Sequence, residues 1–238
     1  MTQKISIMKQ EWHNLLFLHW PIPTSSIRHK IPKQLELDTY NNSAWIGIIP
    51  FQMRKLRPSF AFSIPPISNF TEINLRTYVK DKYNRKGVWF FSLDTQNPFG
   101  NWIARTFFHL NYRYAETEFK TNSDGKFTCK FTMPNTGTPE QSFSWKHAQD
   151  SFMPSKSPES LEFFLTERYR LFSYNDKKDI LLTGTLSHKP YQLNRPRLSQ
   201  FSTDLFLSNG IKFTSSYPES ILACRQTKVD VFPIETVS

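Results

Sequence analysis

Three polar side chains alternate with apolar ones in one short stretch, TEINLRTYV at residues 71–79. Because successive side chains of a β-strand point to opposite faces, Glu72, Asn74 and Arg76 are expected to share one face. An arginine on such a face can bind a carboxylate or phosphate through two hydrogen bonds, and a nearby glutamate can act as an acid or a base. The spacing therefore predicts the polar floor of a site, with Glu72, Asn74 and Arg76 as candidate ligand-binding residues.

The same pattern also fits a strand face in contact with water. Two opposite charges on an exposed strand would form an ion pair that contributes less than ~1 kcal/mol. The two interpretations differ in whether the face of Glu72 and Arg76 is enclosed or open to solvent.

His19 and Arg105 are secondary candidates for ligand binding. His19 lies in LLFLHWP (residues 15–21) among large apolar groups, where a histidine satisfied by hydrogen bonds is the commoner arrangement. Arg105 is four residues from both Asn101 and His109, so the three share one side of an expected helix over residues 98–110. Solvent exposure is the default explanation for such a stripe.

The familiar catalytic and cofactor motifs do not occur. The chain has no G-x-S-x-G elbow, no phosphate-binding Walker loop and no dinucleotide-binding glycine pattern. His13 and His19 share strand parity, but six residues of extended chain put them ~20 Å apart, too far to share a metal ion. The sequence thus predicts no metal and no cofactor, and it identifies no catalytic residue.

The rest of the pattern is mostly β, with two substantial helices, and predicts one domain over residues 1–238. Strands are expected at 13–20, 71–79, 88–94, 170–174 and 180–187, with a hairpin over 112–133 and a last strand near the C-terminus. Pro50 predicts a bulge or an edge within SAWIGIIPFQM, and Asp94 reads as a turn or cap residue. Helices are expected at 98–110 and after a Ser157 cap. Residues 134–156, rich in Ser, Thr and Pro, are expected to form a long surface loop.

Composition limits the function classes. The formal net charge of +10 favours an acidic partner, yet the Lys and Arg residues are scattered, which argues against a nucleic-acid site. The 22 Phe residues indicate a core built largely from aromatic rings. With two widely separated cysteines, no apolar signal-peptide core and no apolar run of membrane length, we expect a reduced, soluble, cytoplasmic protein that does not bind membranes.

Several long segments carry a family resemblance. They are residues 14–53 (NLLFLHWPIPTSSIRHKIPKQLELDTYNNSAWIGIIPFQM), FTEINLRTYV, GVWFFSLD, the stretch from Trp102 to Phe108, and SLEFFLTERYRLFS. On these segments the chain resembles the YqjF-like bacterial family of unknown function. That family is similar, at greater distance, to acetoacetate decarboxylase-like proteins. The resemblance implies a closed, mostly antiparallel β-barrel with flanking helices and a lumen that holds a small anionic or carbonyl compound.

The resemblance also shows what does not carry over. In the decarboxylases a pair of lysines follows the helix that matches residues 98–110, and one of them forms a Schiff base. Tyr112 and Arg113 stand there in this chain, and the glutamates of the decarboxylase site have no counterpart. We therefore expect a small-molecule-binding barrel without the Schiff-base lysine, and whether it turns over its ligand is left open. A non-enzymatic ligand sensor and a basic protein for nucleic acid or an acidic partner are the alternatives, and a homo-oligomer is compatible with the sequence.

Overall fold

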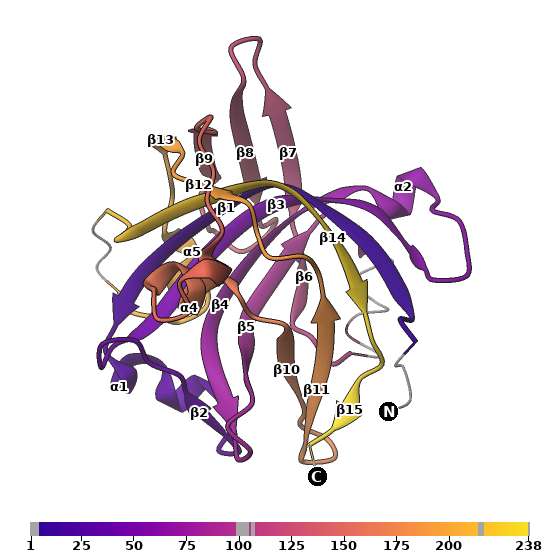
Figure 1. Cartoon of the computed structure of the whole chain (residues 1–238), viewed down its shortest axis with the longest axis vertical. Coiled ribbons are helices and arrows are strands. Elements are labelled where there is room, and N and C mark those ends of the chain that lie inside the picture. Colours follow the sequence, from indigo (N-terminus) through magenta and orange to yellow (C-terminus); the bar gives the residue numbers. More distant parts are fainter. Residues whose placement is uncertain (1–4, 99–104, 106–107, 214–216, 238) are drawn as a thin grey trace.

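The computed structural model describes residues 5–98, 105, 108–213 and 217–237, and two β-sheets account for most of them (Figure 1). The larger sheet contains β1 (Met8–Ile22), β2 (Leu35–Leu37), β3 (Ala44–Pro58), β4 (Phe70–Asp81), β5 (Lys86–Thr95), β6 (Tyr112–Tyr114), β10 (Arg170–Asn175), β11 (Ile180–Ser187), β12 (Leu193–Asn194), β14 (Ser220–Val231) and β15 (Glu235–Thr236). The smaller sheet contains β7 (Glu116–Thr121), β8 (Lys126–Thr132), β9 (Gln141–Lys146) and β13 (Arg197–Gln200). The prediction of a mostly β protein is confirmed.

The larger sheet follows the order β12-β14-β1-β3-β4-β5-β10-β11-β15. β11 also pairs with β14, through Leu186 with Val231 and Ser187 with Asp230. The sheet is not antiparallel throughout, because β5 runs parallel to both β10 and β6. The strand pairings thus lead from β14 through six neighbouring strands and back to β14.

β4 lies between β3 and β5 and is buried on both faces. Ile73, Leu75 and Val79 belong to a cluster that also contains Phe131 and Phe143 of the smaller sheet. The polar residues at even positions point away from this cluster. Strand alternation, as predicted for residues 71–79, therefore separates an apolar face from a polar one.

The pairing of β1 with β3 contains a bulge. Between His13 and Leu18 the register advances five residues in β1 but four in β3, from Gln52 to Ile48. The opposing stretch of β3 contains Pro50, which has no N–H to donate, but the extra residue lies in β1, so the bulge is in the partner strand and not within residues 43–53 as predicted. Asn14, with φ of 53°, adopts the left-handed conformation at the same point.

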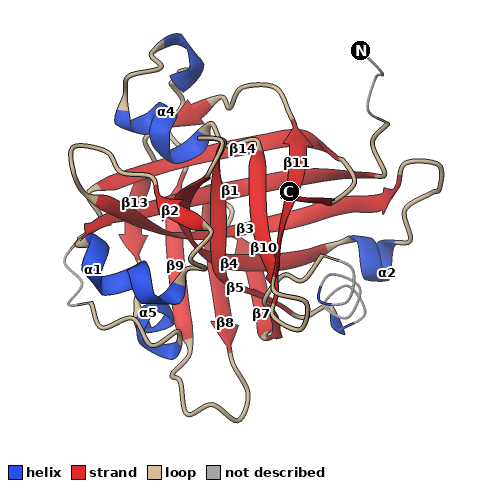
Figure 2. Cartoon of the chain, turned by 90° about the horizontal axis from the view of Figure 1, so that it is seen from below, coloured by secondary structure: helices blue, strands red, loops and turns tan. Residues whose placement is uncertain are grey.

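The described helices are short and lie at the periphery of the strands (Figure 2). They are α1 (Thr24–Ile27), α2 (Pro65–Ser68), α4 (Leu161–Thr166) and α5 (Asp204–Ser208), with 3-10 turns η1 (Arg28–Lys30) and η2 (Pro154–Lys156). α4 is capped by Ser160, whose side chain accepts from the backbone N–H of Phe163, and not by Ser157 as expected. Most of the expected helix over 98–110 lies outside the described residues. The backbone of His109 has a φ of 49° and is therefore not helical, although the residue falls within the expected helix.

The smaller sheet overturns one expectation. The hairpin of β7 and β8 is confirmed, but the expected loop over 134–156 contains β9, whose side chains are buried from Gln141 to Trp145. Phe143 and Trp145 pack in the core that joins the two sheets, and Ser144 between them bonds to the hydroxyl of Thr128 on β8. The many Ser and Thr residues of this segment concealed a strand that is buried on both faces.

Cys129 and Cys224 are buried and free. Among the described residues, no helix has the length and apolar character needed to cross a membrane.

Candidate ligand-binding cavity

A cavity of about 530 Å³ lies against the polar face of β4. Its wall is largely apolar, with Phe17, Ile49, Phe51, Phe70, Leu93 and Tyr191 among its residues. Several polar or charged side chains interrupt this wall, among them Glu72, Asn74, Arg76, Tyr112, Arg168 and a further arginine, Arg57. A concave, mainly apolar space with a few convergent polar groups is typical of a small-molecule site.

Glu72, Asn74 and Arg76 share one face of β4, and all three line the cavity. Their exposed fractions are 3%, 5% and 9%. The interpretation as a solvated strand face is therefore wrong. Their role in binding a ligand stays a prediction.

The guanidinium of Arg76 is held without a carboxylate partner among the described residues. Its Nη2 donates to the backbone oxygen of Leu165 at 3.1 Å and to the hydroxyl of Tyr78 at 3.4 Å. The guanidinium carbon lies 5.7 Å from the ring centroid of Phe17 and 5.6 Å from that of Tyr78. Its Nε–H is buried and has no hydrogen-bond partner in the described part of the chain.

Glu72 is held separately, at the other end of this polar row. The hydroxyl of Tyr112 donates to its Oε2 at 2.9 Å. Burial raises the pKa of Glu72 to about 7, and the negative charge of Asp94 acts in the same direction. The hydrogen bonds from Tyr112 and Asn74 lower the pKa and offset part of this rise. The pKa of Tyr112 itself lies well above its usual value because of burial and the adjacent Glu72, so its hydroxyl keeps the proton that it donates. No ion pair joins Glu72 to Arg76 in the described structure, which differs from the pair that an exposed strand would carry.

Arg168 provides a second buried guanidinium at the cavity and a direct contrast with Arg76. Its Nη1 donates to Oδ2 of Asp38 at 2.6 Å, and its Nε donates to the backbone oxygen of Phe164 at 2.7 Å. Sequence reasoning missed Arg168 and Asp38, because 130 residues separate them and neither belongs to a recognisable motif.

His19 is completely buried and is not among the residues that line the cavity. Its Nε2 lies 2.6 Å from the hydroxyl of Tyr78, which links it indirectly to Arg76. Burial and the charge of Arg76 hold the pKa of His19 well below its usual value, so the ring is neutral. Gly47 faces this ring, and a Cβ there would lie 2.5 Å from His19 Cδ2. His19 therefore supports the site from behind, in a contact that requires glycine opposite.

Arg105 is exposed and does not line this cavity. It lies instead at a wider depression of about 1230 Å³, together with His29, Lys30 and His109. The structure therefore does not bring Arg105 together with Glu72, Asn74 and Arg76.

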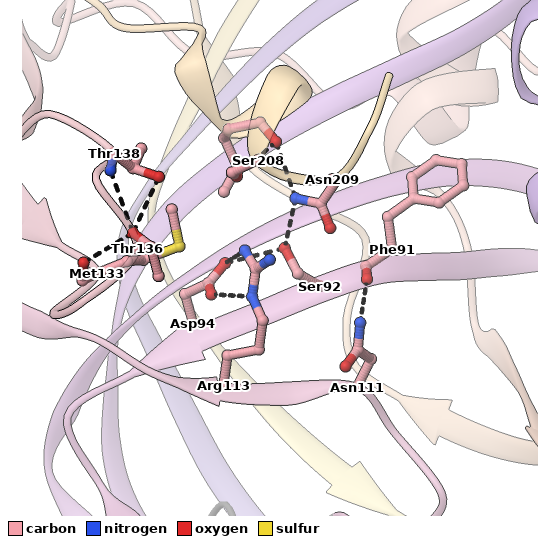
Figure 3. Close-up of polar contacts among 11 residues, drawn as sticks. Phe91, Ser92, Asp94, Asn111, Arg113, Met133, Thr136, Thr138, Ser208 and Asn209 are labelled. Carbon is pink, nitrogen blue, oxygen red and sulfur yellow. Dashed lines mark hydrogen bonds and ion pairs between the residues drawn. The ribbon is translucent and has the colours of Figure 1, made fainter. Parts of the chain in front are cut away.

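Asp94 is a buried member of β5 and not a turn or cap residue as expected. Arg113 donates to its two oxygens, from Nε at 2.6 Å and from Nη2 at 2.9 Å, and Ser92 donates to it at 2.9 Å (Figure 3). Asn209 extends the network to Ser92. Because successive side chains along β6 point to opposite faces, Arg113 pairs with Asp94 while its neighbour Tyr112 faces the cavity.

No group of three or more His, Cys, Asp or Glu side chains within the described ranges is arranged to hold a metal ion.

We predict that Glu72→Gln changes how stability depends on pH. The folded protein keeps a proton on Glu72 up to about pH 7, whereas the unfolded chain loses it near the ordinary value of 4.5. The stabilisation from the protonated group is therefore complete below pH 4.5 and is lost as the pH rises through 7. Urea unfolding at pH 5 and pH 8 should show a relative gain for the glutamine variant on the order of 3 kcal/mol at the higher pH. Exposed Glu118→Gln is the control, and parallel pH profiles for wild type and Glu72→Gln would contradict the assignment.

Family models and curated proteins identify relatives along nearly the whole chain. The model of the DUF2071 family, described as an uncharacterized conserved protein, matches residues 9–228. The uncharacterized protein YqjF of Bacillus subtilis (strain 168) is 36% identical over 215 residues, which cover 90% of this chain and 86% of that protein.

Solved structures show the same fold at low sequence identity. An acetoacetate decarboxylase from Legionella pneumophila superposes with a TM-score of 0.66 at 11% identity and covers 99% of this chain and 88% of its own. An acetoacetate decarboxylase-like enzyme from Sphingomonas wittichii RW1 gives 0.67 at 8% identity, covering 98% and 94%. The enduracididine biosynthesis enzyme MppR complexed with pyruvate gives 0.65 at 11% identity, covering 100% and 92%. The fold is therefore acetoacetate decarboxylase-like, the predicted resemblance is confirmed, and the chain belongs to the DUF2071 family, which includes YqjF-like proteins.

Proposed function

We propose that this chain, as one domain, binds a small carboxylate or related carbonyl compound in the cavity beside β4. Arg76 holds the anionic group, Asn74 and Glu72 contact the rest of the polar surface, and the aromatic wall covers the apolar body. Binding involves no Schiff base. The proposal includes a closed barrel whose lumen is the cavity, which the return of the strand pairings from β11 to β14 supports.

The observation that carries this proposal is the unpaired guanidinium of Arg76. A buried charge without a counter-ion is very costly. The same cavity contains a second guanidinium, Arg168, and that one is paired with Asp38. Within the described residues, Arg76 has two neutral oxygens and two aromatic rings instead. An anionic ligand group at Arg76 Nε would supply the negative charge and the hydrogen-bond acceptor that the described residues do not provide.

The structural neighbours supply independent support. Acetoacetate and pyruvate, named with these neighbours, are both small oxo acids. A fold that accommodates such compounds elsewhere offers a space of suitable size here. We also propose a cytoplasmic location, which the two free cysteines support because disulfides are formed mainly in oxidising compartments.

The test is Arg76→Met, titrated with pyruvate, phenylacetate and hexanoate beside the corresponding amides. Wild type should bind at least one of the carboxylates, and the variant should lose about tenfold to hundredfold in affinity, since hydrogen bonds to charged groups contribute ~1.5–3 kcal/mol. The unliganded variant should unfold at the same temperature as wild type or higher, because no protein carboxylate loses its partner.

Arg225→Met, at an exposed arginine, is the matched control and should bind as wild type does. Equal carboxylate affinity of Arg76→Met and wild type would contradict the proposal. Failure of all three carboxylates to bind wild type would contradict it as well.

We further predict that the protein forms no imine with carbonyl ligands. Lysine is absent from the described lining of the cavity, and Tyr112 lies where the decarboxylase lysine pair is expected. Borohydride reduction in the presence of acetoacetate or pyruvate, followed by mass spectrometry, should show no adduct at any single lysine. A stoichiometric adduct at one lysine would instead establish Schiff-base chemistry.

A further inference from the structure

The polar side chains on the cavity face of β4, Arg76, Asn74 and Glu72, change in character along the strand. At one end Arg76 offers an N–H donor, and in the middle Asn74 Oδ1 is a buried acceptor with no partner in the described part of the chain. At the other end lies the carboxyl group of Glu72. Residues two apart on a strand are roughly 6.6 Å apart, so the Cα atoms of Glu72 and Arg76 are separated by about 13 Å. The cavity wall thus presents a donor, an acceptor and an acid along one line.

A ligand that satisfies this row must change character along its length. It needs an anionic acceptor for Arg76 Nε and a hydrogen-bond donor for Asn74 Oδ1, because a buried polar group without a partner is costly, and a cationic group there would also lie beside the carboxyl group of Glu72. We propose that the ligand is an amine-bearing carboxylic acid that lies along β4, with its carboxylate at Arg76 and its ammonium group at Glu72 and Asn74. This inference rests on the proposed function and names the class of ligand for the same cavity.

The charges around the cavity favour such a zwitterion over a simple acid. The two buried arginines of the cavity, Arg76 and Arg168, both lie over the ring of Tyr78. Near Glu72 the neighbouring charge is the carboxylate of Asp94, which already has its own arginine. Arg76 and Arg168 therefore form a cationic end, and Glu72 lies farther along β4 beside Asp94, while the remaining arginine of the lining, Arg57, donates to the backbone oxygens of Ser59 and Ala61. Between Arg76 and Glu72 the side chains of Ile49, Phe51 and Phe70 offer apolar surface for a methylene chain.

The groups that surround Glu72 do not themselves titrate near pH 6, so a proton taken up or released on binding can be assigned to Glu72. Its register partners, Phe51 on β3 and Thr95 on β5, do not titrate in the accessible range. Tyr112 on β6 stays protonated, and Asp94 is ion-paired. An ammonium group placed beside Glu72 would favour its ionised form. Binding of an aminocarboxylate below pH 7 should therefore release a proton from Glu72, whereas a plain carboxylate should release none.

The experiment is calorimetry at pH 6 in two buffers of different ionisation enthalpy, with butanoate, hexanoate, octanoate, 6-hydroxyhexanoate and the aminocarboxylates of four, six and eight carbons. At least one aminocarboxylate should bind about tenfold or more tightly than the unsubstituted acid of equal length, with release of up to one proton. Glu72→Gln should abolish both the preference and the proton release. Glu118→Gln, at an exposed glutamate, should behave as wild type.

The outcomes separate this inference from the proposed function. If hexanoate binds through Arg76 but no aminocarboxylate binds more tightly, or if Glu72→Gln keeps the preference, the ligand class is wrong and the proposed function stands. If none of these carboxylates binds wild type, both are wrong. Circular dichroism of each variant establishes that it is folded before binding is compared.

Discussion

A buried guanidinium needs a negative charge nearby, and this need governs the arrangement around the cavity. Arg168 meets it with Asp38, and the partly buried Arg113 is likewise paired with Asp94. Arg76 is the exception in the described structure, where backbone and phenol oxygens and two aromatic faces hold it. Those contacts fix the position of the guanidinium, but they leave its charge to be neutralised by something that enters the cavity.

The fold makes this arrangement stable. β4 is flanked by β3 and β5, and its apolar face packs towards the smaller sheet, so its polar face is fixed towards the cavity. A slip of one residue in register would turn Glu72, Asn74 and Arg76 into the aromatic core. On β6 the same alternation sends Tyr112 to Glu72 and Arg113 to Asp94. The two positions thus divide between the cavity and a structural ion pair, and neither is a lysine.

Local patterns predicted much of this protein. The alternation of residues 71–79 and the hairpin within residues 112–133 could be predicted because each depends on near neighbours. The burial of the β4 polar face was not readable, because an enclosed face and a solvated one have the same alternation. β9 was missed because its serines resemble a loop in the sequence, whereas in the fold Ser144 bonds to the hydroxyl of Thr128 on β8. The pairs Tyr112–Glu72 and Arg168–Asp38 join residues 40 and 130 positions apart, so no local spacing reveals them.

The central claim is that Arg76 Nε–H is available to a ligand carboxylate. The most direct measurement is an ¹H–¹⁵N spectrum of the arginine side chains, with the Arg76 signal assigned by its loss in Arg76→Met. On titration with a carboxylate that binds, this Nε–H proton should move strongly downfield as a charge-assisted hydrogen bond forms, and the matching amide should leave it in place. Saturable carboxylate binding that leaves the Arg76 signal unmoved would contradict the account.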